Sequence, residues 1–489
     1  MRTRIFIRFA LCLVLLPFGL LAQVEPDSTP RPESYQDFKE NAIEEYNKFK
    51  AQAFSEYERF LAEAWKEYQA FAGKKSAFAE PKPESIPALK ISSGADEDET
   101  PSKYRSVPLP SSEHPDDALI TPQDSETVSI NFYGCKLNFQ LSEKLRVKAK
   151  STKERDISRY HETMRKSDVD QSLSKQLDAT VSRLGLNEWG YFALLRSLSE
   201  KTFTKMDDRV LFCFYMLHSH GFKARVGRGQ RSGQLILLLA LDNSKEVYSK
   251  TFFRINGTKF YAVYGGTKDE NVYSYDEKAD DSGLKEIALD FKQPLNMRAC
   301  DRKRILHLDK ANLDIELPYS TSHLRYYDDV PMTEFPIYVK SAISNEAEQA
   351  LTETFGTLAE KTDKTQRVDL MLNFVQTAFA YKIDEKQFGR EKYFFPEEVI
   401  GYPFSDCEDR CALFAWLVRH YTDYDVIGIL YADHLATAVC FGDDAQPAGK
   451  SLTYKGKNYV ICDPTYENAP IGTLMPKYND AKFEIIELN

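Results

Sequence analysis

Aromatic residues recur at every eleventh position near the start of the chain, between residues 35 and 71. Eleven residues occupy three turns of an α-helix, about 3.67 residues per turn, so residues with this spacing share one face. We therefore predict a long amphipathic helix over residues 33–75, which packs on the protein's own domains or self-associates with a second copy. Its acidic polar face argues against a role on a membrane surface. The columns of the stripe are Tyr35, Tyr46, Tyr57 and Tyr68; Phe38, Phe49, Phe60 and Phe71; and Ile43, Phe54 and Trp65.

Two segments that flank this helix differ in composition from a folded domain. Residues 1–22 place three arginines before the apolar run 9–22, which is short for a membrane span and typical of a signal peptide. Residues 76–126 are polar and rich in proline, and they predict an extended or disordered linker. No later segment has the length of a transmembrane span. We therefore expect an exported protein with a bacterial-type signal peptide, either periplasmic, at the cell surface or secreted.

The rest of the chain contains an internal duplication with a period near 200 residues. The stretch FTKMDDRVLFCFYM at 203–216 resembles FSDCEDRCALFAWL at 404–417, and the apolar run 233–241 matches 433–441. From Met206 to Gln234 is 28 residues, and from Cys407 to His434 is 27. A weaker similarity relates LNFQL at 137–141 to LDIEL at 313–317. Each copy therefore predicts a β-rich lead, helices, a buried helix and then strands.

The duplication sets the expected domain boundaries. The first unit covers residues 127–266, a connector follows at 267–302, and the second unit covers residues 303–489. Both units mix helical and strand patterns, so we predict the α+β class for each.

Cys407 lies where the buried helix of the second unit should begin. Ser405 and Glu408 have the spacing of a capping box, which would make Ser405 the N-cap and Cys407 the second helical residue. A thiol at that position faces free backbone N–H groups and the positive end of the helix dipole. Both effects predict a lowered thiol pKa, as a cysteine nucleophile requires, and the N–H groups would also stabilise an oxyanion.

Two further residues complete a candidate catalytic triad. His434 follows the apolar run 426–432 and begins a strand, where it would act as general base and then protonate the leaving amine. Asp463 ends the strand YVICDP and would orient the imidazole. Cys407, His434 and Asp463 therefore predict acyl transfer through a thioester intermediate.

The segments FVQTAFAYKID at 374–384 and FGREKYFFPEEVIGYPFSDCEDR at 388–410 resemble the transglutaminase-like cysteine peptidases. The resemblance covers about residues 350–470, with a weaker copy at about 187–266. It implies a papain-like fold in which the nucleophile helix packs on an antiparallel sheet, and it matches Cys407, His434 and Asp463 to the family's triad. Gln376 matches the family's Val-Gln position, which implies a contribution to the oxyanion site. Ser405 departs from the family, which often has glycine there.

The first unit keeps the helix start but lacks the chemical groups. Thr204 and Asp207 again have capping-box spacing. Met206, Gln234 and Tyr264 occupy the three triad positions, so no thiolate, base or orienting carboxylate remains. We interpret this unit as a catalytically inactive copy kept for structure or for binding.

Charge and cysteine usage narrow the partners and cofactors. A formal net charge of −10 argues against nucleic acid, which requires a clustered basic surface. The seven cysteines that follow the signal peptide are unevenly spaced and do not suggest a disulfide framework. A zinc site built from Cys407, Cys411, His434 and Cys440 is the weaker alternative, because Cys411 lies in an apolar run and loops of the CxxC type are absent. We therefore expect neither a metal nor another cofactor.

Two classes of function follow from the sequence. The first is an exported cysteine-dependent amide hydrolase or acyl transferase that acts on a peptide, protein or peptidoglycan-like substrate. Hydrolysis is favoured over crosslinking, since no feature of the sequence indicates a tunnel that excludes water. The second is a non-enzymatic scaffold of the cell envelope, built on transglutaminase-like domains.

Overall fold

The computed structural model describes residues 106–109, 125–167, 170–242, 245–248, 250–266, 271–274, 281, 283–442, 445 and 447–488. The predicted signal peptide and aromatic helix, and most of the predicted linker, lie outside these residues. Strand β1 (Ser106–Pro108) falls within the linker range and pairs antiparallel with β9 (Arg302–Leu308). None of the helices that the structure describes combines the length and the apolar character needed to cross a bilayer.

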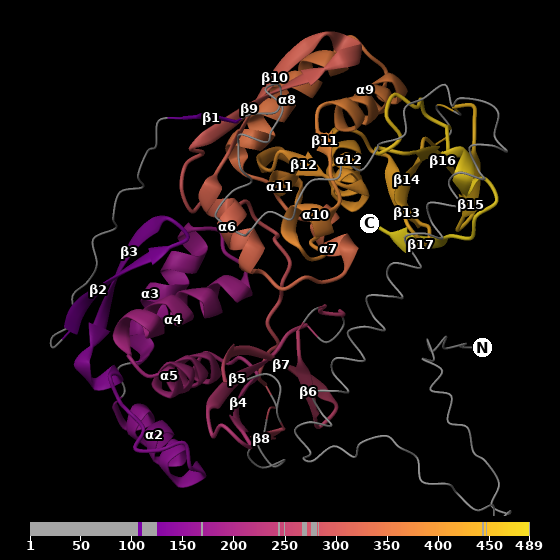
Figure 1. Ribbon diagram of the computed structural model, residues 1–489. Coiled ribbons are helices and arrows are strands. Elements are labelled where there is room, and N and C mark those ends of the chain that lie inside the picture. The colour runs from indigo at the N-terminus through magenta and orange to yellow at the C-terminus, as the bar shows by residue number, and fades with distance from the viewer. Residues whose placement is uncertain are drawn as a thin grey trace, which may run out of the picture. The chain divides into compact units, whose positions relative to one another are not determined.

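The protein belongs to the α+β class, and its two largest sheets have the same topology. Each sheet has five strands, and each strand runs antiparallel to its neighbours. The curled shape of both sheets is visible in Figure 1. In order across the sheet, the first contains β6 (Phe252–Ile255), β7 (Thr258–Gly265), β5 (Leu235–Ala240), β4 (Ala224–Gly229) and β8 (Val272–Ser274). The second contains β15 (Ser451–Tyr454), β16 (Lys457–Cys462), β14 (Leu435–Cys440), β13 (Asp425–Leu430) and β17 (Glu484–Glu487).

A buried helix precedes each sheet and packs against it. These helices are α5 (Met206–Ser219) and α12 (Cys407–Tyr421). Every side chain at 210–217 and at 411–418 is buried, because both runs are apolar all round and meet neighbours on every side. Each unit also begins with a hairpin, β2 (Ser125–Phe132) with β3 (Cys135–Ser142), and β9 with β10 (Leu313–Tyr319). The similar stretches LNFQL and LDIEL lie in β3 and β10.

The two units differ in what lies before the buried helix. In the first unit only residues 203–205 separate α4 (Glu188–Thr202) from α5. In the second unit residues 378–406 separate α9 (Lys364–Thr377) from α12. This insertion holds β11 (Ala380–Tyr381), α10 (Asp384–Phe388), α11 (Pro396–Gly401) and β12 (Phe404–Ser405). The remaining helices are α2 (Glu154–Ser167), α3 (Asp170–Arg183), α6 (Thr321–Asp329), α7 (Phe335–Val339) and α8 (Asn345–Ala359).

The predicted caps of both buried helices are wrong by one residue. Asp406, and not Ser405, is the N-cap of α12, so Cys407 is the first helical residue. The backbone N–H of Asp406 donates to Asp409 at 3.1 Å. Ser405 instead lies in β12 and accepts a hydrogen bond from Arg410 Nε at 3.3 Å. In the first unit Lys205 takes the N-cap position that we assigned to Thr204.

Arg410 joins the start of α12 to the end of α9. Its guanidinium is buried and donates to the carbonyl oxygens of Phe379 at 2.7 Å and Gln376 at 3.3 Å. The corresponding Arg209 of the first unit donates to the carbonyl of Phe203, just beyond α4, at 2.7 Å. The arginine shared by the two similar stretches thus fixes the buried helix on the helix before it.

We expect the variant Arg410→Met to lose about 3 kcal/mol of unfolding free energy. The change leaves buried carbonyls without their charged donor, and hydrogen bonds to charged groups contribute about 1.5–3 kcal/mol each. Urea denaturation followed by circular dichroism would measure the loss. Arg209→Met is the matched control, with a smaller expected loss because Arg209 is only half-buried. Equal losses in the two variants would contradict the special position of Arg410.

Candidate active site

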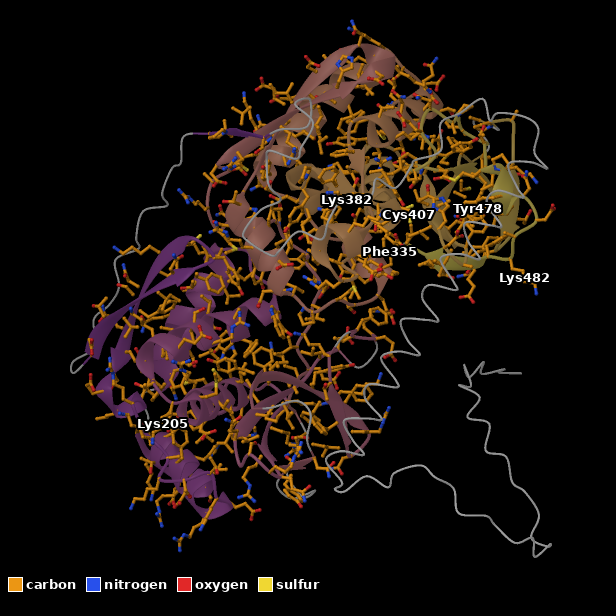
Figure 2. All side chains as sticks on the ribbon, in the orientation of Figure 1. Lys205, Phe335, Lys382, Cys407, Tyr478 and Lys482 are labelled. Carbon is orange, nitrogen blue, oxygen red and sulfur yellow. The ribbon has the colours of Figure 1, made fainter. Side chains whose placement is uncertain are left out.

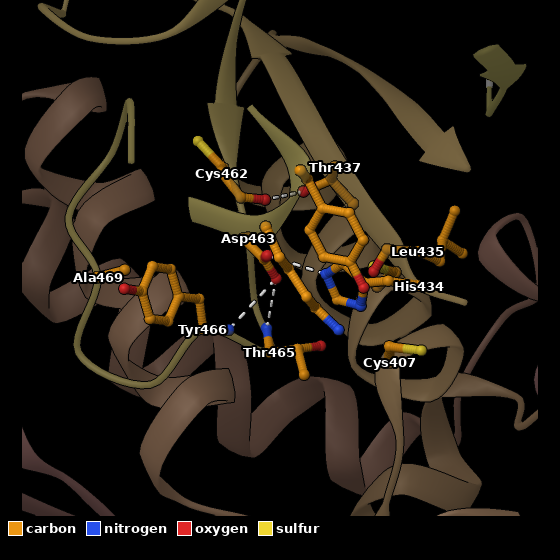
Figure 3. Close-up of polar contacts among 12 residues, drawn as sticks. Cys407, His434, Leu435, Thr437, Cys462, Asp463, Thr465, Tyr466 and Ala469 are labelled. Carbon is orange, nitrogen blue, oxygen red and sulfur yellow. Dashed lines mark hydrogen bonds and ion pairs between the residues drawn. The ribbon is translucent and has the colours of Figure 1, made fainter. Parts of the chain in front are cut away.

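The three predicted triad residues come from three elements that meet at one end of the second sheet. Cys407 is the first residue of α12, His434 immediately precedes β14, and Asp463 immediately follows β16. Strands β14 and β16 are antiparallel neighbours with Thr437 opposite Cys462, so the start of one lies beside the end of the other. Helix α12 packs on β14, and the N–H of Leu435 at the start of β14 is directed at the Cys407 sulfur, so the cysteine lies at the same end (Figures 2 and 3).

His434 and Asp463 form a buried hydrogen-bonded pair. Nε2 of His434 lies 2.9 Å from Oδ2 of Asp463, and both side chains are excluded from solvent. The other carboxylate oxygen accepts the backbone N–H groups of Thr465 at 3.0 Å and Tyr466 at 3.3 Å (Figure 3). An ionised carboxylate only accepts, so Nε2 carries the proton and Nδ1 remains able to take one from a thiol.

An aromatic side chain that sequence reasoning missed covers the imidazole. Tyr478, at the end of the 3-10 helix η5 (Pro476–Tyr478), stacks on His434 with ring centroids 5.1 Å apart and planes 11° apart. Tyr431 also stacks on Tyr478, with ring centroids 4.4 Å apart, and the Tyr478 hydroxyl donates to Asp433 at 3.0 Å. The C-terminal segment carries no motif, so only the folded structure shows that Tyr478 restricts the orientation of the imidazole.

The thiol of Cys407 is hydrogen-bonded to the next residue, Glu408, and not to the imidazole of His434. Cys407 Sγ donates to Oε2 of Glu408 at 2.9 Å. No hydrogen bond between Sγ and His434 is present among the residues of the site, and Figure 3 draws none. Burial, followed by the charges of Glu408 and Asp406, raises the thiol pKa well above its usual value, while the backbone N–H of Leu435 opposes this. The predicted lowering of the pKa is therefore wrong for this arrangement.

The Gln376 amide, which we predicted to contribute to the oxyanion site, binds two backbone carbonyl oxygens in the structure. Its Nε2 atom donates to the backbone carbonyl oxygens of Asp463 at 2.9 Å and Ala469 at 3.0 Å. These two bonds use both amide hydrogens, and the side chain is buried. Gln376 therefore holds the loop that carries Asp463, and it contributes to the site indirectly.

Three buried carboxyl groups cluster at the start of α12. One oxygen from each of Asp384, Asp406 and Asp409 falls within 4.8 Å of the others. Burial raises the pKa of Asp384 to about 8, and burial and mutual repulsion raise the pKa values of Asp406 and Asp409 well above the usual range. A metal ion binds ionised carboxylates, so a cation at this trio would have to overcome the burial and repulsion that favour the protonated forms.

The zinc alternative also lacks the necessary geometry. Cys411 is fully buried within α12 and donates its thiol hydrogen to the carbonyl of Leu435 at 3.3 Å. His434 already pairs with Asp463, and Cys407 pairs with Glu408. The seven cysteines within the described ranges are free, and Cys411 serves as a small core residue.

The corresponding positions of the first unit carry no triad. Met206 begins α5 and is 40% exposed, and Gln234 directly precedes β5. Strand β7 contains one extra residue opposite the pair Leu237 and Leu238, so Gly265 takes the position equivalent to Asp463. Tyr264, which we aligned with Asp463, is the residue before it and donates to Glu200 at 3.1 Å. The extra residue explains the error in the alignment.

We expect Gln376→Ala to destabilise the protein by about 1–3 kcal/mol, because two buried carbonyl oxygens lose their donor. Thermal unfolding would measure the change. An oxyanion role would produce the opposite pattern, an unchanged midpoint of unfolding with loss of reaction only. Gln349→Ala, on the exposed surface of α8, is the matched control and should stay within about 0.5 kcal/mol of the native protein.

Comparison with known proteins does not assign this chain to a family. No protein-family model matches the sequence. Searches of curated proteins and of solved structures also give no significant match. Its function is therefore inferred from the residues and the geometry of the site.

Proposed function

We propose that this protein is an exported, cysteine-dependent amide hydrolase or acyl transferase. The observation that carries the proposal is the buried His434–Asp463 pair at the end of the sheet where Cys407 begins α12. A histidine oriented by a carboxylate beside a cysteine at a helix start is the arrangement that nucleophilic catalysis requires. The substrate would be an amide bond in a peptide, a protein or a peptidoglycan-like polymer.

The first half of the reaction would form a thioester. Nδ1 of His434 takes the proton of the Cys407 thiol, and the sulfur attacks the carbonyl carbon of the amide. The backbone N–H of Cys407 lacks an intrahelical acceptor because it begins the helix, so it is the donor best placed for the oxyanion. The imidazolium then protonates the amine as the carbon–nitrogen bond breaks.

The second half would return the free enzyme. His434 removes a proton from water, the resulting hydroxide attacks the thioester, and the acid leaves as the sulfur regains a proton from the imidazolium. An amine in place of water would give transamidation by the same steps. Asp463 keeps the imidazole in one tautomer throughout, and Tyr478 limits its rotation.

A transglutaminase-like, papain-related fold is the structural part of the proposal. Support comes from the helix α12 packed on an antiparallel sheet, and from the order of Cys407, His434 and Asp463 along the chain. Export and a periplasmic or cell-surface location are supported by the composition of residues 1–22 alone.

A non-enzymatic scaffold is the second candidate, and two observations favour it. The Cys407 thiol is buried, bonded to Glu408 and protonated at neutral pH, and the first unit has already lost its triad. In that case the second unit would retain the residues of the triad without using them.

A peptide-derived chloromethyl ketone, which alkylates a reactive thiol to a stable thioether with release of chloride, would separate the candidates. We expect labelling of the native protein to be lost in Cys407→Ala and slowed by about 10²–10⁴-fold in His434→Ala, the range for removal of a general base. Peptide mass spectrometry would identify the labelled residue. Cys440→Ala is the matched control, because Cys440 is the half-buried cysteine outside the site. Absence of labelling at Cys407 in the native protein would favour the scaffold.

A further inference from the structure

The hydrogen bond between Cys407 and Glu408 opposes the chemistry that the rest of the site supports. His434 and Asp463 are already paired, with Nδ1 able to accept a proton. The thiol nevertheless donates its hydrogen to the Glu408 carboxylate at 2.9 Å. A carboxylate that accepts this hydrogen favours the neutral thiol, and its negative charge disfavours a neighbouring thiolate. Glu408 thus stabilises the unreactive form of the nucleophile.

The first unit shows what an acidic residue at this helix position does when no cysteine is present. Asp207 corresponds to Glu408, and its Oδ1 accepts the backbone N–H of Leu235 at 2.8 Å. Leu235 corresponds to Leu435, whose N–H is directed at the Cys407 sulfur in the second unit. In both units the acidic side chain therefore turns across the helix start toward the same end of the sheet. In the second unit the Cys407 thiol lies between the Glu408 carboxylate and the backbone N–H of Leu435.

The charges around the thiol reinforce the effect of Glu408. No Lys or Arg is among the charges that act most strongly on Cys407, which are those of Glu408 and Asp406. From the neighbouring elements the site is faced by His434 and Asp463 on the sheet, Tyr478 on η5, Tyr381 on β11, Asp384 on α10, and Glu391. His434 is the one base among them that can form a stabilising ion pair with a thiolate.

We propose that Glu408 is a latch that holds the Cys407 thiol in a neutral resting state, away from His434. Release requires the S–H bond to rotate from the Glu408 carboxylate to Nδ1 of His434, which then takes the proton and forms the thiolate–imidazolium pair. No group is gained or lost in this step. The latch deepens the proposed function and rests on it, because it regulates the proposed nucleophile. Glu408 acts here as a positioning residue.

Removal of the charge at position 408 tests the latch. We expect Glu408→Gln to raise the rate of Cys407 alkylation by iodoacetamide at pH 7 by about tenfold or more, and to shift the midpoint of the pH–rate profile downward, since one nearby charge moves a pKa by about 1–3 units. Glu408→Asp keeps the charge and should retain a high midpoint. Glu385→Gln, an exposed residue on α10, is the matched control and should behave as the native protein. Peptide mass spectrometry restricts the measurement to Cys407.

A second measurement does not depend on the access of iodoacetamide to Cys407. The absorbance of the thiolate near 240 nm, taken as the difference from Cys407→Ser, reports ionisation without any reagent. Circular dichroism and the midpoint of unfolding would show that each variant is folded. An unchanged alkylation rate and an unchanged thiolate titration in folded Glu408→Gln would overturn the latch.

The double variant Glu408→Gln/His434→Ala separates the latch from the proposed function. If the acceleration disappears in the double variant, His434 activates the released thiol, and both proposals are supported. If the acceleration persists at full size, Glu408 still restrains the thiol. In that second case His434 has no influence on Cys407, so the proposed catalytic triad and release of the thiol to His434 are contradicted, and only the restraint of the thiol by Glu408 remains.

Discussion

The start of α12 is fixed by the buried guanidinium of Arg410, and the candidate site depends on that position. Arg410 bonds to the carbonyl oxygens of Gln376 in the last turn of α9 and Phe379 just beyond it, and to Ser405 in β12. On the same turn, Asp409 accepts the backbone N–H groups of Phe394 and Asp406. The insertion 378–406 is thereby held against the first turn of the helix. The position of Cys407 is a consequence of these contacts, since the residues on both sides of it are already fixed.

The sequence predicted the features that depend on periodicity and order along the chain. The α+β class and the two buried helices follow from apolar runs and from the duplication, which are local patterns. The predicted strand positions of His434 and Asp463 are wrong by one residue, because His434 precedes β14 and Asp463 follows β16. The cap of α12 was wrong because two capping patterns overlap by one residue. Ser405 with Glu408 and Asp406 with Asp409 both have the required spacing, and Arg410 decides between them by occupying Ser405. That contact depends on the folded backbone between β12 and the first turn of α12, and the capping-box spacing alone does not reveal it.

The residues that surround the imidazole were beyond sequence reasoning for the same reason. Tyr478 stacks on His434 from a segment without a motif, and its position depends on the hydrogen bond to Asp433. Gln376 lies at a position that the resemblance marks, yet its amide serves the backbone of the Asp463 loop. The extra residue in β7 displaced the alignment of the first unit by one position. For Tyr478 and Gln376 the sequence shows which bonds the side chain can form, but it does not show the groups that the side chain contacts in the fold.

The pKa of the Cys407 thiol shifts in the opposite direction from the one that the helix dipole alone predicts. A helix N-terminus favours a negative charge by about 0.3–1 kcal/mol, and by up to about 2 kcal/mol in a partly buried position. One pKa unit corresponds to about 1.4 kcal/mol, and burial alone can raise a pKa by several units. Burial and the carboxylates of Glu408 and Asp406 therefore outweigh the helix dipole at this cysteine. A catalytic thiolate in this site must obtain its stabilisation from His434, which requires the thiol to leave Glu408 first.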